Sequence, residues 1–319
     1  MLASFRVARY RFVLEAIDEL RMPAYQGSTF RGGLGHVLKR LVCFAPDTRA
    51  CVPCGRRIDC PYGYLFATTA PPDIPGLHGL REIPPPFVIE APSGEPRRYH
   101  PGEQLGFDLV LIGRAIGYLP YFLMAFQELG RAGVGRPSGR YALRSIHACR
   151  PWGTEQQIFD GAEVRPAAEP SVSWPEVADR AALLPADRLT LRFLTLTRIK
   201  YQRGYVERPE FHMLLRALLR RISALALFHC GERWPGDARA LIAAADPVRI
   251  AGAQLRWVGW ERFSGRQQQR IQLGGFAGEI TYHGDLAPFR EYLALGALVH
   301  VGKAAVFGHG RYDIVTPSG

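Results

Sequence analysis

The feature that most constrains the fold is an order of apolar periodicities that occurs twice along the 319 residues. In the first half, alternation of apolar and polar residues predicts strands, and apolar residues three and four positions apart predict helices. The predicted elements are a strand at 5–14, a helix at 28–43, strands at 87–90 and 104–112, a helix at 118–129 and a strand at 140–148.

The same order starts again near residue 189. Its predicted elements are a strand at 189–200, a helix at 209–229, strands at 254–262 and 270–283, a helix at 286–298 and a strand at 307–315. We therefore predict an α+β protein with two tandem ferredoxin-like domains of order βαββαβ, the arrangement that RRM-type RNA-binding domains also use. Because this fold carries many activities, the function must be argued from particular residues.

The expected domain limits follow from the segments between these elements. The first ferredoxin-like domain covers 1–150 and contains a Cys-rich, irregular insertion at about 45–86. Five prolines and weak periodicity predict a linker at 151–185, and the second domain covers 186–319.

Composition excludes several classes of protein. Apolar residues make up 47% and charged residues 22% of the chain, which is typical of a globular protein and not of a disordered or collagen-like one. The most apolar stretch, 214–230, contains three arginines, so no segment reaches the ~20 apolar residues of a membrane helix. Residues 1–11 do not resemble a secretory signal. We expect a cytoplasmic protein without a membrane span.

The charge favours a polyanionic partner. Forty Lys and Arg residues against 29 Asp and Glu give a net charge of +11. Such an excess suits a surface that neutralises phosphates. The alternative is a compositional bias of the genome toward arginine, because only Lys39, Lys200 and Lys303 are lysines.

A glycine-rich segment near the C-terminus is the next candidate site. It differs from a nucleotide-binding P-loop, which requires glycine where Ala297 stands and serine or threonine where Ala304 stands. What remains is a Gly302-Lys303 pair followed by a Gly-x-Gly-Arg sequence ending at Arg311. The glycines allow close approach of the backbone to a phosphate chain, and the two basic side chains supply charge.

These motifs resemble the CRISPR-associated endoribonucleases of the RAMP superfamily, which cut precursor CRISPR RNA within its repeats. The resemblance in the C-terminal half rests on LRFLTLTRIK (191–200), LLRALLRR (214–221) after Phe211, GGFAGEI (274–280), GDL (284–286) and HVGK to GHGRY (300–312). In the N-terminal half it rests on GSTFRGGLGH (27–36) and residues 133–141. Ala304 and Ala305 depart from the glycine and small polar residues that are frequent in the family.

The resemblance implies two ferredoxin-like domains and metal-independent cleavage, with no cofactor for catalysis. In that chemistry the ribose 2′-hydroxyl attacks the neighbouring phosphate and leaves a 2′,3′-cyclic phosphate and a 5′-hydroxyl. The family usually places a histidine on the first helix of the N-terminal domain, where His36 stands, and Tyr25 and Lys39 are similar to residues that assist in some members. The alternatives are a packed or solvent-facing His36, a core Tyr25 and a solvated Lys39.

Other basic residues are candidates for RNA binding. Arg31 lies beside Gly32, Gly33 and Gly35 and could hold a phosphate near the helix N-terminus, although these glycines could instead serve helix packing. A strand period of two places three basic residues of the 189–200 strand on one face. The RNA-binding candidates are Arg31, Arg192, Arg198, Lys200, Lys303, His309 and Arg311.

Four cysteines lie within eighteen residues. Cys43, Cys51, Cys54 and Cys60 have the spacing C-x7-C-x2-C-x5-C, which favours a structural zinc site in a cytosolic protein over reduced thiols or a disulfide.

The sequence as a whole predicts an endoribonuclease that cleaves CRISPR repeat RNA and so produces mature guide RNA. The main alternative is a non-catalytic RAMP-fold RNA-binding subunit of a CRISPR effector complex. A zinc-stapled protein-interaction module is the third. Candidate protein partners are other subunits of an effector complex and a second copy of the chain.

Overall fold

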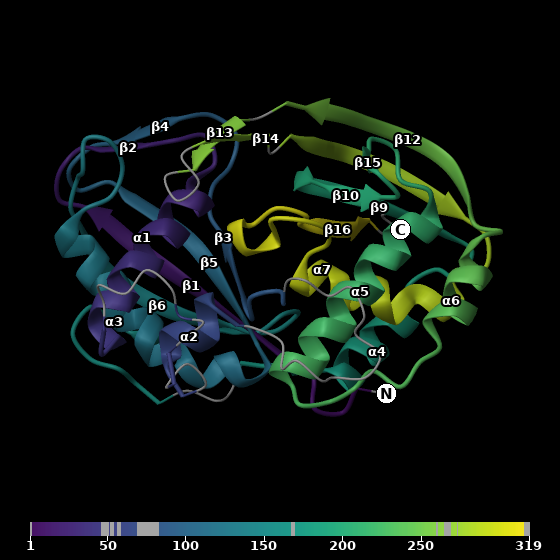
Figure 1. The fold of residues 1–319 in the computed structure, drawn as a ribbon, viewed down its shortest axis with the longest axis horizontal. Helices are drawn as coiled ribbons and strands as arrows, with labels where there is room; N and C mark the ends of the chain where they lie inside the picture. The colour runs from purple at the N-terminus through teal and green to yellow at the C-terminus, as the bar shows by residue number, and fades with distance from the viewer. Residues whose placement is uncertain are drawn as a thin grey trace. The chain divides into compact units, whose positions relative to one another are not determined.

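The computed structural model describes residues 2–45, 51, 54–55, 59–68, 83–166, 170–259, 261–264, 269–272 and 274–315. The chain forms two compact units, which Figure 1 shows in the colours of the sequence. The N-terminal unit contains Arg6–Val172 and Phe228–Gly231. The C-terminal unit contains Met1–Phe5, Ser173–Leu227 and Glu232–Gly319.

The N-terminal unit is built on an antiparallel sheet of order β3-β5-β1-β6-β7, in which β8 also pairs with β1. The strands are β1 (Arg6–Ala16), β3 (Phe87–Glu90), β5 (Gln104–Ile112), β6 (Tyr141–Cys149), β7 (Glu155–Phe159) and β8 (Val172–Ser173). Two helices, α1 (Gln26–Val42) and α3 (Leu119–Ala132), pack on each other and on the sheet.

An aromatic cluster fixes this packing. Phe12 and Phe107 of the sheet stack with their ring centroids 5.1 Å apart. Phe30 of α1 lies 4.9 Å and Phe126 of α3 lies 4.7 Å from Phe107, measured between ring centroids. All four side chains are buried. Because large aromatic rings contribute much of the energy of a core, this cluster sets the face of α1 that turns inward.

The C-terminal unit repeats the topology. Its antiparallel sheet has the order β12-β15-β9-β16, formed by β9 (Arg188–Thr197), β12 (Arg249–Val258), β15 (Gly275–His283) and β16 (Tyr312–Val315). Its helices are α4 (Trp174–Ala182), α5 (Phe211–His229), α6 (Ala238–Ala245) and α7 (Arg290–Val299). In both sheets the second, third, first and fourth strands of the βαββαβ pattern are neighbours in that order, which confirms the predicted tandem ferredoxin-like fold.

The segment 151–185 differs from the predicted irregular linker, because it contains β7, β8 and α4. Helix α4 begins at a capping box in which Ser173 and Glu176 bond reciprocally, and Pro175 stands in its first turn, where a proline is tolerated. Trp174, Val177 and Ala181 form its buried face. The prolines of this segment therefore include one that starts a helix.

Shorter elements complete the described part of the chain. They are β2 (Leu20–Met22), α2 (Pro61–Phe66), β4 (Arg97–Tyr99), η1 (Gly113–Tyr118), β10 (Ile199–Tyr201), β11 (Gly204–Val206), β13 (Glu261–Ser264), β14 (Gln269–Gln272), η2 (Ala287–Phe289) and η3 (Ala305–Phe307). Most of the predicted Cys-rich insertion lies outside the described residues. Within them, no helix is both long and apolar enough to cross a membrane.

Candidate functional site

Helix α1 presents His36 on its outer side. The buried positions Phe30, Leu34, Val37 and Leu38 turn toward the core, and His36 is exposed. Among the residues that the structure describes, none forms a hydrogen bond or ion pair with its imidazole. A histidine side chain that faces outward from a helix can exchange a proton with a ligand that approaches it.

The glycines of α1 divide into two groups. A Cβ on Gly33 would lie 2.7 Å from the Leu129 Cδ1 atom, and one on Gly35 would lie 2.8 Å from the Phe66 Cε1 atom. The packing alternative is therefore correct for these two. Gly32 differs, because a Cβ there would meet no atom within 4 Å. Gly32 lies one turn N-terminal to His36. Because long helical side chains lean toward the N-terminus, the His36 imidazole leans toward the open space at Gly32.

Gly32, His36 and Arg40 form an exposed stripe along α1. Arg40 was not singled out from the sequence. It lies four residues after His36, as Gly32 lies four residues before it, and it is exposed. Residues four apart are neighbours on one helix face. The i, i+4 spacing from His36 was the signal that could have found it.

Tyr25 lies far from His36 along α1. It is the N-cap residue, and its carbonyl oxygen accepts a hydrogen bond from the Ser28 hydroxyl at 3.2 Å. Because the two residues are eleven positions apart, a helical rise of 1.5 Å per residue separates them by roughly 16 Å along the axis. The structure therefore does not bring Tyr25 and His36 to one reacting atom.

Lys39 and Arg31 take other contacts. Lys39 is half-buried, and its charge opposes the burial that raises the pKa of the Cys51 thiol. Arg31 is half-buried as well, and its guanidinium lies over the Phe66 ring, 5.0 Å from the centroid. Arg31 thus helps to fix α2 on α1, a packing role that sequence reasoning did not anticipate.

The four clustered cysteines are free thiols. The negative charges of Cys43, Cys54 and Cys60 contribute to the raised pKa of Cys51, which indicates that the four lie in one neighbourhood. Within the described ranges, however, no three His, Cys, Asp or Glu side chains form a group that could hold a metal ion. The zinc site stays a prediction.

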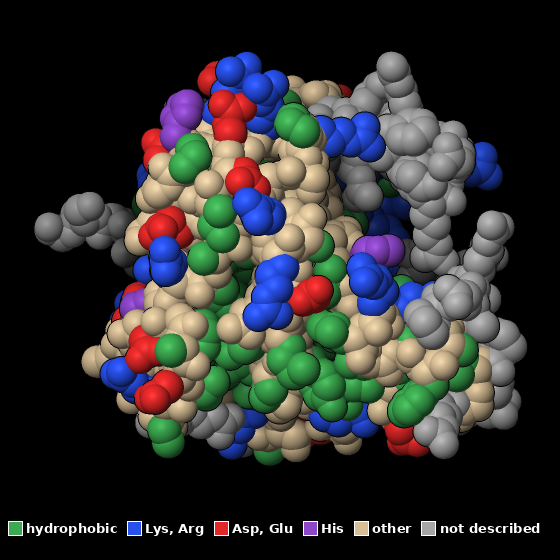
Figure 2. Space-filling view, turned by 90° about the vertical axis from the view of Figure 1, so that its left-hand side faces the viewer, with side chains coloured by type: hydrophobic (Ala, Val, Ile, Leu, Met, Phe, Trp, Pro, Cys, Tyr) green, Lys and Arg blue, Asp and Glu red, His purple; other side chains and the backbone are tan. Residues whose placement is uncertain are grey.

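The outer face of the N-terminal sheet is neutralised by ion pairs. Arg9 pairs with Glu90 at 3.0 Å, Arg11 with Asp108 at 3.0 Å, and Arg144 with Glu15 at 2.6 Å. Figure 2 likewise shows basic and acidic side chains interspersed on the face that it presents. The positive charge of the chain is therefore not gathered on these surfaces, which disfavours an RRM-like use of the N-terminal sheet.

In the C-terminal unit, the glycine-rich segment folds back on β9. The Lys303 N–H donates to the Arg198 carbonyl oxygen at 2.9 Å, and the Gly310 N–H donates to the Leu196 carbonyl oxygen at 3.0 Å. Gly302 and Gly310 have φ values of +84° and +74°, and a Cβ at either would collide with a backbone carbonyl oxygen. Glycine is required at both positions, and the Lys303 side chain is left exposed.

The two histidines of this segment are structural. His309 is 3% exposed, and its Nδ1 lies 3.1 Å from the Leu196 carbonyl oxygen. Burial lowers its pKa to about 4, so the imidazole is neutral near pH 7. His300 is also buried, with Nδ1 2.9 Å from the His309 carbonyl oxygen. The expectation that the His309 side chain contacts RNA is corrected, because the side chain is enclosed.

The prediction that one face of a 189–200 strand carries three basic side chains is wrong. Strand β9 ends at Thr197, and Arg198 is buried with its guanidinium 4.2 Å from the Tyr205 ring centroid. Arg192 is exposed but pairs with Glu279 at 2.6 Å, and Lys200 is exposed on β10. The alternation of side chains breaks where β9 gives way to β10, which a period of two could not reveal.

Arg221, one of the arginines of α5, is buried. Its Nε donates a hydrogen bond to the carbonyl oxygen of Val299, the last residue of α7, at 2.7 Å. Burial lowers its pKa to about 10. A cation at a helix C-terminus is favourable, so Arg221 fixes the point where α7 leads into the glycine-rich segment.

Two family models match the chain. A model described as an N-terminal domain matches residues 5–171. The model of the CRISPR-associated endoribonuclease Cas6 matches residues 191–312. No curated protein matches the chain.

Solved structures share the fold over almost the whole chain. A product complex of Thermus thermophilus Cas6 is 19% identical with a TM-score of 0.58, covering 97% of this chain and 99% of that one. Another structure of Thermus thermophilus Cas6 is 18% identical with a TM-score of 0.53, covering 98% and 99%. A partial Cas6-RT-Cas1–Cas2 complex is 14% identical with a TM-score of 0.58, covering 99% of this chain and 47% of that one.

Proposed function

Because the chain belongs to the CRISPR-associated endoribonuclease Cas6 family of the RAMP superfamily, and is thus an endoribonuclease of precursor CRISPR RNA processing, we propose that His36 is its general base. The observation that carries the proposal is the exposed imidazole above the open space at Gly32. Because a Cβ on Gly32 would meet no atom within 4 Å, we propose that a phosphodiester approaches His36 from this side.

The proposed reaction needs no metal ion. His36 removes the proton of the ribose 2′-hydroxyl, the 2′-oxygen attacks the adjacent phosphorus, and the bond from phosphorus to the 5′-oxygen breaks. The leaving 5′-oxygen takes up a proton from water, and His36 returns its proton to the solvent. The products are a 2′,3′-cyclic phosphate and a 5′-hydroxyl.

Charge that develops on the phosphate oxygens requires a nearby cation. Arg40 shares the exposed stripe with His36, and Lys39 lies one turn after His36 on a neighbouring helix position. Fixed positive charge at the site of a developing oxyanion stabilises the transition state. We assign Arg40 this role, with Lys39 assisting, and place Tyr25 on RNA that flanks the cut.

RNA binding is assigned to the glycine-rich segment and to exposed basic side chains. Lys303 and Arg311 lie at the two ends of a segment whose glycines let the backbone approach a phosphate chain. Lys200 is exposed and available to a phosphate, whereas Arg192 would have to exchange its ion pair with Glu279. Repeat RNA is the proposed substrate, and other CRISPR proteins are the proposed partners.

The test is cleavage of the cognate repeat RNA in excess EDTA, with analysis of the 3′ end. We expect a single cut that leaves a cyclic phosphate, and at least a hundredfold slower single-turnover cleavage by His36→Ala. His100→Ala is the matched control, because His100 is an exposed histidine of the same unit outside α1. It should cleave as the wild type does.

Each other outcome has a definite meaning. Tight binding without a cut by the wild type would favour the non-catalytic RNA-binding subunit. Full cleavage by His36→Ala would keep the enzyme and move its base elsewhere. Cleavage that disappears with EDTA and returns with a divalent ion would contradict the proposed chemistry.

A further inference from the structure

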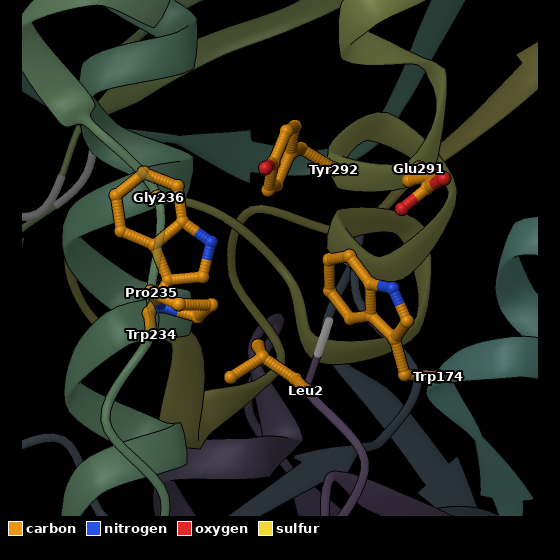
Figure 3. A pocket seen from close by; sticks show the side chains of 7 residues that line it. All are labelled: Leu2, Trp174, Trp234, Pro235, Gly236, Glu291 and Tyr292. Carbon is orange, nitrogen blue, oxygen red and sulfur yellow. The ribbon is translucent and has the colours of Figure 1, made fainter.

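The C-terminal unit contains a cavity of about 150 Å³ that the proposed RNA chemistry does not use. Figure 3 shows its lining, which comes from four separate places in the sequence. Leu2 lies near the chain start, Trp174 is the first residue of α4, and Trp234–Gly236 follow α5. Glu291 and Tyr292 stand in the first turn of α7.

Three aromatic rings form walls of this cavity. The Trp174 and Tyr292 ring centroids lie 5.7 Å apart with an angle of 61° between the planes. The Trp234 and Tyr292 centroids lie 6.0 Å apart with an angle of 83°. Figure 3 shows the two indoles on opposite sides of the opening with the phenol ring between them. The rings therefore meet edge to face where they line the cavity.

The local structure holds these rings in place. Trp174 is 3% exposed, so its indole is set by the core. The Trp234 side chain hydrogen-bonds the Tyr292 hydroxyl. A Cβ on Gly236 would collide with the Trp234 indole, which shows that this ring folds back directly onto the Pro-Gly segment. The aromatic walls are thus preorganised, which reduces the entropy cost of binding.

The charge of the lining is negative. Glu291 is its only ionisable carboxylate, and no Lys or Arg lines the cavity. Among the described residues, no Lys or Arg forms an ion pair with Glu291, although the chain has 40 basic residues. A half-exposed carboxylate beside three aromatic rings complements a cation and repels a phosphate.

We propose that this aromatic cage, formed by Trp174, Trp234, Tyr292 and Glu291, binds an organic cation whose ammonium group is carried on an alkyl chain. The ammonium lies within about 6 Å of the ring centroids, where cation–π attraction acts, and pairs with the Glu291 carboxylate. The alkyl chain packs on Pro235, an exposed apolar residue of the lining. Two sources share this chemistry: a free polyamine and the lysine side chain of a partner protein.

The first experiment is isothermal titration calorimetry of the full chain with choline and with its neutral isostere 3,3-dimethylbutanol. We expect choline to bind at least tenfold more tightly, because only the charge differs. Adenosine is titrated as an uncharged aromatic ligand. Equal binding of choline and 3,3-dimethylbutanol, or tighter binding of adenosine than of choline, would overturn the proposal. Absence of binding by choline, spermidine and an Nα-acetyl-lysine amide would overturn it as well.

Titration of spermidine and of the lysine amide separates the sources. If spermidine binds more tightly, the ligand class is a free polyamine, and if the lysine amide binds more tightly, it is a protein lysine. Either result supports the cage.

Variants test the residues and separate this site from RNA cleavage. Glu291→Gln keeps the shape and should weaken choline binding at least tenfold, and Gly236→Ala should weaken it by displacing Trp234. The matched control is Glu207→Gln, an exposed glutamate of the same unit outside the cavity, which should bind choline normally. Both glutamate variants should cleave repeat RNA at the wild-type rate. Unchanged choline binding in Glu291→Gln would contradict the assignment.

Discussion

The hydroxyl of Thr195 donates a hydrogen bond to the Gly308 carbonyl oxygen at 2.8 Å. The Thr195 hydroxyl oxygen in turn accepts a hydrogen bond from the Arg311 N–H at 3.0 Å. One side chain on β9 therefore satisfies both a carbonyl and an amide of the glycine-rich segment. This contact sets the path of the backbone between Lys303 and Arg311, the two charges assigned to RNA.

Thr195→Val removes both hydrogen bonds with little change in volume. It leaves the Gly308 carbonyl and the Arg311 amide without this partner, which should lower the free energy of unfolding by about 1–3 kcal/mol. We also expect several-fold weaker binding of repeat RNA. Thr195→Ser retains the hydroxyl and should stay close to wild type in both denaturant unfolding and RNA affinity. Equal stability of the valine and serine variants would show that these bonds are unimportant.

The two adjacent glycines Gly32 and Gly33 should respond in opposite directions to substitution. Gly32→Ala should stabilise the protein by about 0.5–1 kcal/mol, because glycine is unfavourable inside a helix and the site has room. Gly33→Ala should destabilise it by roughly 1–3 kcal/mol, because Leu129 must move. Denaturant unfolding measures both changes.

Activity adds a second expectation at Gly32. Gly32→Leu fills the open space below His36 and should slow single-turnover cleavage at least tenfold while the fold is retained. If the leucine variant cleaves as fast as wild type, the substrate does not enter by this route.

Salt dependence tests the RNA contacts of Lys303 and Arg311. Each phosphate contact that is lost should reduce the slope of log affinity against log salt by about 0.7 for single-stranded RNA. We expect this change in Lys303→Ala and Arg311→Ala. Arg131→Ala is the control, because Arg131 is exposed and already paired with Glu128 at 3.2 Å. An unchanged slope in both test variants would remove them from the interface.

Acid should weaken the C-terminal unit through His309. Its pKa is lowered to about 4 by burial, so between pH 6.5 and about 4 the unfolded chain binds a proton there that the folded chain does not. Stability from this group is therefore complete above pH 6.5 and is lost as the pH falls toward 4, by about 3 kcal/mol in all. Unfolding measured across this range should be less pH-dependent in His309→Gln. An identical pH profile in the variant would contradict the account.

Short apolar runs with clear ends predicted two of the core strands well. Strands 87–90 and 104–112 were predicted at their observed bounds, since both are buried against a helix layer and end at polar or glycine residues. Helix α4 was not predicted, because the prolines of the 151–185 segment indicate a linker, although Pro175 occupies a position where a helix accepts it. The break at Arg198 was hidden because its burial depends on Tyr205, a tertiary contact.

The candidate site was predictable only in part. Exposure of His36 follows from the apolar spacing around it, and the need for glycine at 302 and 310 agrees with a tight backbone path. The burial of His309 and Arg221 depends on neighbours from β9 and α7 and cannot be seen in local sequence. The aromatic cage cannot be seen in local sequence either, because its lining comes from four segments that lie far apart along the chain.

The central claim is that the 2′-hydroxyl is the nucleophile, and one substitution in the RNA tests it most directly. The repeat RNA is made with a single 2′-deoxynucleotide on the 5′ side of the cut, and binding and cleavage are measured with the wild-type protein in excess EDTA. The account predicts unchanged affinity and no cut at that position. Cleavage of the deoxy substrate at the normal site would contradict it, because water or another nucleophile would then have to attack the phosphate.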